Sequence, residues 1–113
     1  MLLKSIIAIS LLSALSSCVS SNKYYWGEYE NLIYAQYQEP GKATPDYQIE
    51  KMLADMHRAA GQHLPMPPGF YAHLGYQYLQ TGKAVEARKY FSAEKRFYPE
   101  SAVLMDRFIS KLK

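Results

Sequence analysis

Apolar residues recur with helical spacing from the mid-twenties of the chain onward. Between Trp26 and Gln38 they fall at i, i+3, i+7 and i+11 and comprise Trp26, Tyr29, Ile33 and Tyr37. This spacing places them on one face of a helix. Pro40-Gly41 should end that helix, because proline cannot continue the hydrogen bonding and glycine tolerates a turn.

A second helix is predicted from Thr44 to about Ala60. Thr44-Pro45-Asp46 supplies a capping hydroxyl, a proline suited to the first turn and an acid at the positive dipole end. The predicted core stripe is Ile49, Met52, Leu53, Met56 and Ala60, and the residues expected to face water are Glu50, Lys51, Asp55 and Arg58. Gly61 is the expected C-cap, followed by a stiff proline-rich connector over 62–68.

Small and bulky residues then follow a helix-hairpin pattern between Pro68 and Ser101. The positions are Tyr71, Leu74, Gly75, Tyr78, Ala87, Phe91 and Pro99. They resemble one tetratricopeptide repeat of about 34 residues, with Tyr71 in place of the usual tryptophan. Gly75 and Ala87 are small where two antiparallel helices must cross closely. Glu94 departs from the pattern, because such repeats usually carry alanine at this contact with the following helix.

A final helix should begin at Glu100 or Ser101. Its apolar stripe contains Leu104 or Met105, then Phe108, Ile109 and Leu112, which looks like the capping helix of a repeat protein. We therefore predict an all-α domain over 24–113 with about five helices: an N-terminal helix pair, one tetratricopeptide-like hairpin and a capping helix. A single repeat does not bury its own apolar surface, so the N-terminal pair or a second molecule must complete the stack.

The first 17 residues have the pattern of a secretory signal. Lys4 precedes a short apolar run that ends in small residues. The run is shorter than the roughly 20 residues that a spanning helix needs. Leu15-Ser16-Ser17-Cys18 resembles the bacterial lipobox, which implies cleavage between Ser17 and Cys18 and lipidation of Cys18. The alternative is a free thiol beside an ordinary cleavage site, although a lone thiol suits an oxidising compartment poorly.

The tether predicted at 18–23 is short. Val19 stands where aspartate marks inner-membrane retention in enterobacterial lipoproteins, so the resemblance favours the periplasmic face of the outer membrane. Five extended residues span at most about 17 Å, which keeps the domain near the bilayer. Tyr24, Tyr25 and Trp26 then lie at headgroup depth or begin the first helix and pack into the core, and both readings stay open.

Composition and motifs exclude several classes of function. Without the first 17 residues, 96 remain, with 12 basic and 10 acidic side chains spread along the chain, so no nucleic-acid footprint is present. The three histidines, His57, His63 and His73, have no metal-ligand spacing. Nucleophile elbows and phosphate or dinucleotide loops are also missing from the sequence. We expect neither enzymatic activity nor a cofactor.

Tyrosine is the unusual component, with 11 copies against one tryptophan and four phenylalanines. Tyrosine is enriched at partly wet interfaces. Tyr29, Tyr71, Tyr78 and Tyr90 are expected in the core or at its rim. Tyr76 and Gln80 lie off the buried stripe, on the face that commonly lines a partner groove in tetratricopeptide repeats, so we predict them as partner-binding residues.

Four segments resemble a family of small uncharacterised Gram-negative lipoproteins known only as a domain of unknown function: residues 25–30, 40–45, 73–76 and 100–107. Its members are often encoded beside two other lipoproteins, one similar to the curli secretion channel, which implies a shared envelope complex. We expect a non-enzymatic protein–protein interaction or assembly factor that binds other envelope proteins. The alternative is a periplasmic binding module for a peptide or cell-wall fragment.

Replacing Cys18 with serine tests the predicted anchor. Serine lacks the sulfur that is alkylated, so the C18S chain should incorporate no labelled palmitate and should leave the membrane fraction. Ser17→Ala is the matched control and should be labelled normally, because it keeps a small residue before the cysteine. Palmitate label on the C18S chain would contradict the prediction.

Overall fold

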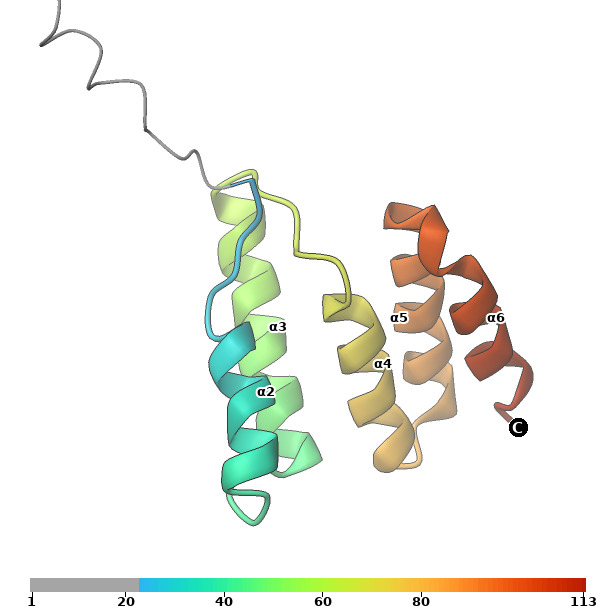
Figure 1. Ribbon diagram of the computed structural model, residues 1–113, viewed down its shortest axis with the longest axis horizontal. Coiled ribbons are helices and arrows are strands. Elements are labelled where there is room, and N and C mark those ends of the chain that lie inside the picture. Colours follow the sequence, from blue (N-terminus) through green and yellow to red (C-terminus); the bar gives the residue numbers. More distant parts are fainter. Residues whose placement is uncertain (1–22) are drawn as a thin grey trace, which may run out of the picture.

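Helices make up the regular structure of the computed structural model, which describes residues 23–113 (Figure 1). Within these residues there are five α-helices and no strand: α2 (Tyr29–Gln38), α3 (Pro45–Gly61), α4 (Phe70–Gln80), α5 (Ala84–Phe97) and α6 (Ala102–Ser110). A short 3₁₀ helix, η2 (Pro99–Ser101), joins α5 to α6. The predicted all-α fold with five helices is confirmed. Ser17 and Cys18 lie outside the described residues.

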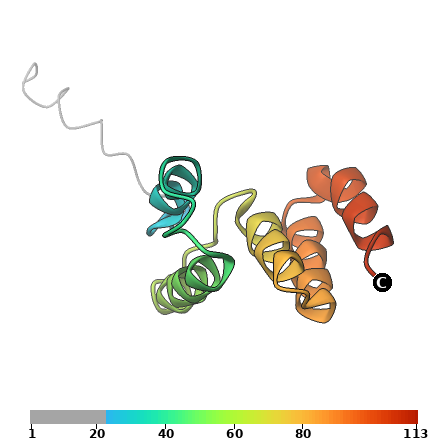
Figure 2. The same ribbon diagram turned by 90° about the horizontal axis from the view of Figure 1, so that it is seen from below.

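The helices stack as two antiparallel hairpins and a last helix. Figure 2 shows α3, α4 and α5 in a row, with α2 on the α3 side and α6 against α5. The packing of α4 on both α3 and α5 joins the two hairpins. In the described part of the chain, no helix is both long and apolar enough to cross a bilayer.

The core is densest where α4 crosses α5. Phe70, Leu74 and Phe91 are fully buried there. A Cβ added to Gly75 would lie 2.8 Å from the Phe91 ring and 3.1 Å from the carbonyl oxygen of Ala87. Only glycine allows the two backbones to approach this closely, as the spacing of small residues predicted.

The helix ends agree with the sequence prediction in α3 and differ in α2. The Thr44 hydroxyl accepts a hydrogen bond from the Tyr47 amide at 3.3 Å, as expected of a cap. The prediction that α2 begins at Trp26 was wrong, because Gly27 adopts a left-handed conformation (φ 49°) and the helix starts at Tyr29. Gly61 is the last helical residue rather than the cap, which is Gln62.

The predicted stripes also need correction at single positions. In α2, Leu32 was left out of the predicted stripe and is 3% exposed, whereas Tyr37 was included and is 81% exposed. In α6 the alternative left open between Leu104 and Met105 is settled by burial, because Met105 is 1% exposed and Leu104 is 49% exposed. The predicted helical period is correct. Where large residues are neighbours in the sequence, however, the period alone did not determine which of them faces the core.

Asp55 was predicted to face water and is instead buried. Its Oδ2 accepts a hydrogen bond from the Glu28 amide at 2.9 Å, just before α2 begins, and Arg58 donates to Oδ1 at 3.2 Å. A Cβ at Gly27 would lie 2.5 Å from the Asp55 carboxyl carbon, so glycine is required for this approach. The carboxylate thus lies at the positive end of the α2 dipole.

Glu94 has the same role in the second hairpin. It is 3% exposed, and its Oε1 accepts a hydrogen bond from the Gly69 amide at 2.7 Å, where α4 begins. Gly69 also has a left-handed conformation (φ 91°). Among the described residues, Glu94 Oε2 has no hydrogen-bond partner. The residue that departs from the repeat pattern therefore caps α4.

Substituting Gly75 tests the close helix crossing. Gly75→Ala places a methyl group against Phe91 and the Ala87 carbonyl, so we expect the free energy of unfolding to fall by about 1–3 kcal/mol. Gly61→Ala is the matched control, because no atom lies within 4 Å of its added Cβ, and it should be neutral or slightly stabilising. Urea unfolding followed by circular dichroism measures both. Equal stabilities of the two variants would argue against the crossing.

Candidate interaction groove

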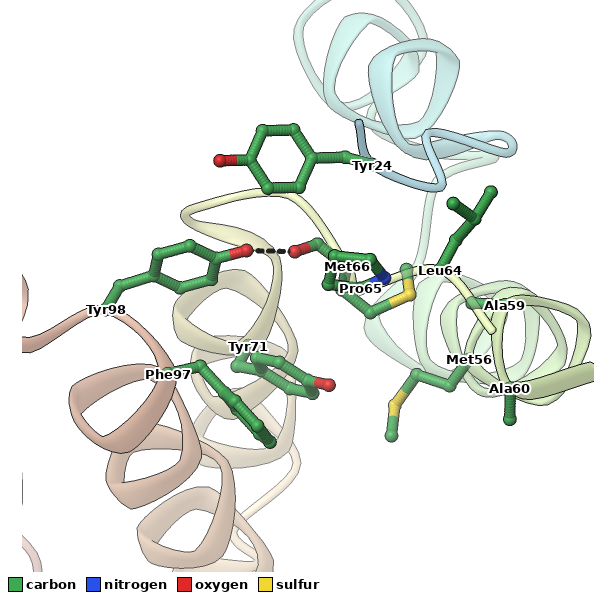
Figure 3. A pocket seen from close by; sticks show the side chains of 10 residues that line it. All are labelled: Tyr24, Met56, Ala59, Ala60, Leu64, Pro65, Met66, Tyr71, Phe97 and Tyr98. Atoms are coloured by element: carbon green, nitrogen blue, oxygen red, sulfur yellow. Dashed lines mark hydrogen bonds between the residues drawn. The ribbon is translucent and has the colours of Figure 1, made fainter. Parts of the chain in front are cut away.

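A cavity of about 540 Å³ opens between α3, α4, α5 and the connector that follows α3 (Figure 3). Its walls are apolar or aromatic: Tyr24, Met56, Ala59, Ala60, Leu64, Pro65, Met66, Tyr71, Phe97 and Tyr98. A second cavity of about 320 Å³ adjoins it and shares Met56, Tyr71 and Phe97. The two cavities together are called the α3–α5 groove below.

Hydrogen bonds to the main chain hold the connector wall of the groove in place. The Tyr25 amide donates to the Pro65 carbonyl at 2.9 Å, and the Tyr98 hydroxyl donates to the Met66 carbonyl. Met66 itself is 3% exposed, so this part of the connector is anchored in the core. The proline-rich segment was predicted to be stiff, and these contacts give it a defined position.

Tyr71 supplies a polar group inside the larger cavity. Figure 3 shows its ring between Phe97 and Met56, with the hydroxyl directed into the cavity. The ring stacks on Phe97 with centroids 5.4 Å apart. Burial raises the pKa of Tyr71 and raises the pKa of Tyr98 to about 12, so both phenols stay protonated at neutral pH. Tyr71 therefore offers a hydrogen-bond donor inside an apolar surface.

Two cations flank the second cavity. Lys89 and Arg96 are seven residues apart on α5, which places them on one face of that helix. The Arg96 guanidinium lies over the Phe97 ring at 4.9 Å, and the Lys89 ammonium lies over the Tyr90 ring at 5.2 Å. No aspartate or glutamate lines either cavity of the groove. The groove thus combines an apolar floor with a positive rim.

The residues predicted from the repeat pattern are distributed between core and groove. Leu74, Gly75, Ala87 and Phe91 meet at the crossing of α4 and α5. Tyr78 stacks on Tyr90 with centroids 5.5 Å apart, and Pro99 begins η2 after α5. Only Tyr71 reaches the groove. The predicted burial of Tyr29, Tyr78 and Tyr90 is confirmed.

Tyr76 and Gln80 are exposed on α4 and line neither cavity of the groove. Their contact with a partner stays a prediction. Tyr76 is 45% exposed, and Leu79, one turn away, is 40% exposed, so this part of α4 carries its own apolar surface.

Most groove residues were not predicted as site residues. Met56 and Ala60 were placed in the core stripe of α3, yet Met56 is only half-buried and Ala60 is exposed beside the cavity. Helical periodicity identifies an apolar face but not whether another element covers it. The sequence feature that pointed to an exposed apolar site, and that was not used, is the pair of adjacent aromatic residues Phe97 and Tyr98 at the end of α5.

The aromatic cluster before α2 divides between core and groove. Tyr25 packs against the core, and Tyr24 forms part of the groove wall. Trp26 is 44% exposed and stacks on Tyr29 with centroids 6.4 Å apart. The reading that these residues begin the first helix and pack into the core holds only for the packing of Tyr25, because all three precede α2 and Trp26 is exposed. Their contact with a membrane stays a prediction.

A buried polar network joins α3 to α2 and α4. Gln48 Nε2 donates to the Leu32 carbonyl at 2.9 Å, which leaves Gln48 Oε1 to accept from His73 Nε2 at 2.9 Å. Gln77 Nε2 lies 3.2 Å from the same ring nitrogen. Burial lowers the pKa of His73 from its ordinary 6.5. In residues 23–113 no group of three possible ligand side chains is placed to hold a metal ion.

The chain also matches one family of known proteins. Residues 23–108 match the family described as Domain of unknown function (DUF4810), and this match covers more than half of the chain. The chain therefore belongs to that family. No curated protein and no solved structure matches it.

The lowered pKa of His73 predicts a loss of stability in mild acid. As the pH falls below 6.5, the unfolded chain takes up a proton at His73 before the folded chain does, so the free energy of unfolding decreases. His73→Gln should remove the contribution of His73 to the decrease in the free energy of unfolding between about pH 7.5 and about pH 5.5. Urea unfolding at both pH values measures it. His57→Gln, at an exposed site, is the control, and equal pH dependence in all three proteins would contradict the prediction.

Proposed function

We propose that this member of the DUF4810 family is a membrane-anchored lipoprotein that acts as a non-enzymatic protein–protein interaction or assembly factor in the bacterial envelope. The α3–α5 groove is the observation that carries the proposal. Soluble proteins seldom leave a continuous apolar surface uncovered unless a partner binds it. Aromatic and arginine side chains such as Phe97, Tyr98 and Arg96 are the residue types that dominate binding energy at interfaces.

The hairpin of α4 and α5 supports the resemblance to a tetratricopeptide repeat. Its two helices cross at Gly75 and Ala87, with Leu74 and Phe91 packed beside the crossing. Such repeats serve as scaffolds for binding other proteins. We therefore regard α2 and α3 as the pair that completes the stack and α6 as its capping helix.

The proposed anchor also restricts where a partner can be. Tyr24 lies in the groove wall, and Cys18 precedes it by six residues, which span at most about 20 Å when extended. Lipidation of Cys18 would hold the groove near the bilayer surface. The expected partners are therefore envelope proteins at the same membrane, including neighbouring lipoproteins such as one similar to the curli secretion channel.

Binding of an exported peptide or cell-wall fragment is the second candidate. The cavity volume of about 540 Å³ falls in the range of small-ligand sites, and the Tyr71 hydroxyl inside it supplies one orienting polar group. A protein partner is favoured because the groove continues from the first cavity into the second, so that it is longer than a single small-ligand cavity.

Filling the groove should remove the partner. Ala60 is exposed on the cavity wall, so Ala60→Trp should occupy the cavity without disturbing the core. We expect mild cross-linking in intact cells, followed by purification of the full chain, to recover a protein partner whose yield falls by about tenfold in this variant.

Val103→Trp is the matched control, because Val103 is 76% exposed on α6 and lines neither cavity. It should recover the partner at the wild-type yield. Recovery of the wild-type chain only as a free monomer would argue against an interaction function. Equal yields from the two tryptophan variants would place the interaction outside the groove.

A further inference from the structure

We propose that the α3–α5 groove binds a partner segment that places a bulky apolar side chain in the cavity beside Tyr71 and an aspartate or glutamate carboxylate against Lys89 and Arg96. The inference rests on the proposed interaction function and specifies the chemistry of the partner.

The larger cavity accounts for the apolar half of this segment. It contains no charged side chain, and its volume of about 540 Å³ accommodates a large aliphatic or aromatic group. Its connector wall is held by the hydrogen bonds of Tyr25 and Tyr98 to main-chain carbonyls, so little ordering should be needed on binding. A preformed apolar cavity of this kind favours a single inserted anchor residue.

Lys89 and Arg96 account for the acidic half. Three cations of the described chain have carboxylate partners: Lys42 with Glu39, Arg58 with Asp55 and Lys95 with Asp106. Among residues 23–113, no ion pair includes Lys89 or Arg96. Glu86 is close enough to raise the pKa of Tyr90, to which burial contributes more, but it does not line the groove.

The surroundings make these two cations effective binding groups. Each lies over an aromatic ring beside an apolar cavity, where a bound partner would exclude water. Excluding water strengthens the attraction between a carboxylate and a guanidinium or ammonium group. A basic segment would instead be repelled by Lys89 and Arg96, because no acidic side chain in the groove lining offsets their charge.

A polypeptide segment fits better than an anionic lipid, although both combine apolar and acidic parts. Tyr71 lines both cavities, and its hydroxyl points into the apolar space. There it can donate a hydrogen bond to a main-chain carbonyl of a peptide, whereas an acyl chain offers no acceptor at that depth.

Site-specific photo-cross-linking of the full chain in its native membrane tests the proposal. A photoreactive residue at Ala60 reports on the groove, and the same residue at Tyr76 or Gln80 reports on the exposed α4 surface. Mass spectrometry of the Ala60 adduct should identify a protein segment with a bulky apolar residue within a few positions of an aspartate or glutamate.

Charge reversal then tests the role of the cations. Lys89→Glu and Arg96→Glu together should lower the Ala60 adduct by about tenfold or more, whereas Arg96→Lys should retain most of it. Arg88→Glu is the control, because Arg88 is exposed on α5 and lines neither cavity. Replacing the acidic residue of the captured segment with lysine should restore the adduct to the charge-reversed chain. The melting curve of each variant verifies its fold.

Several outcomes would overturn the inference: an adduct on lipid, an adduct on a segment without acidic residues, or an adduct that persists after charge reversal. Adducts from Tyr76 or Gln80 without any from Ala60 would also overturn it, yet would leave the interaction function standing. Silence at all three positions would remove the inference and the proposed function together.

Discussion

Two buried carboxylates determine where the helix hairpins begin. Asp55 and Glu94 lie on the second helix of their hairpins, and each accepts the amide hydrogen of the residue just before the first helix. A buried carboxylate loses hydration, and here backbone N–H groups and the positive helix end offset that loss. Gly27 and Gly69 adopt left-handed conformations beside these bonds, which lets the chain turn into each helix. The shared arrangement indicates that the two hairpins are versions of one structural unit.

Glu94 links the packing of the hairpins to the chemistry of the groove. Burial and the charge of Glu94 raise the pKa of Tyr29 to about 12, and the same charge acts on Tyr71 and Tyr98, which line the groove. All three phenols stay neutral at neutral pH. Tyr98, on which the charge of Glu94 acts, also donates a hydrogen bond to the Met66 carbonyl. The residue that caps α4 thus influences a residue that holds the connector wall. A change at Glu94 should therefore affect the groove as well as α4.

Short-range patterns in the sequence predicted the helices. The buried carboxylates and the groove instead depend on contacts between residues that are far apart in the chain. Thr44 caps α3 through a bond three residues away, so its role could be inferred from adjacent residues. Asp55 and Glu94 bind amides 27 and 25 residues away, so neighbouring residues gave no sign of either bond, and the helical pattern placed Asp55 on the side that faces water. The groove was missed for a related reason, because Met56 and Ala60 satisfy helical periodicity whether or not another element covers them.

The position of Tyr24 connects the groove with the proposed anchor. Tyr24 forms part of the groove wall, where its ring meets that of Tyr98 edge to face with the centroids 6.4 Å apart. A partner segment in the cavity would therefore touch Tyr24 as well as α3 and α5. A chain of this size has little core to spare, so apolar groups left open in the groove contribute less to its stability than buried ones. A partner segment that covers these groups would therefore add to the stability of the domain.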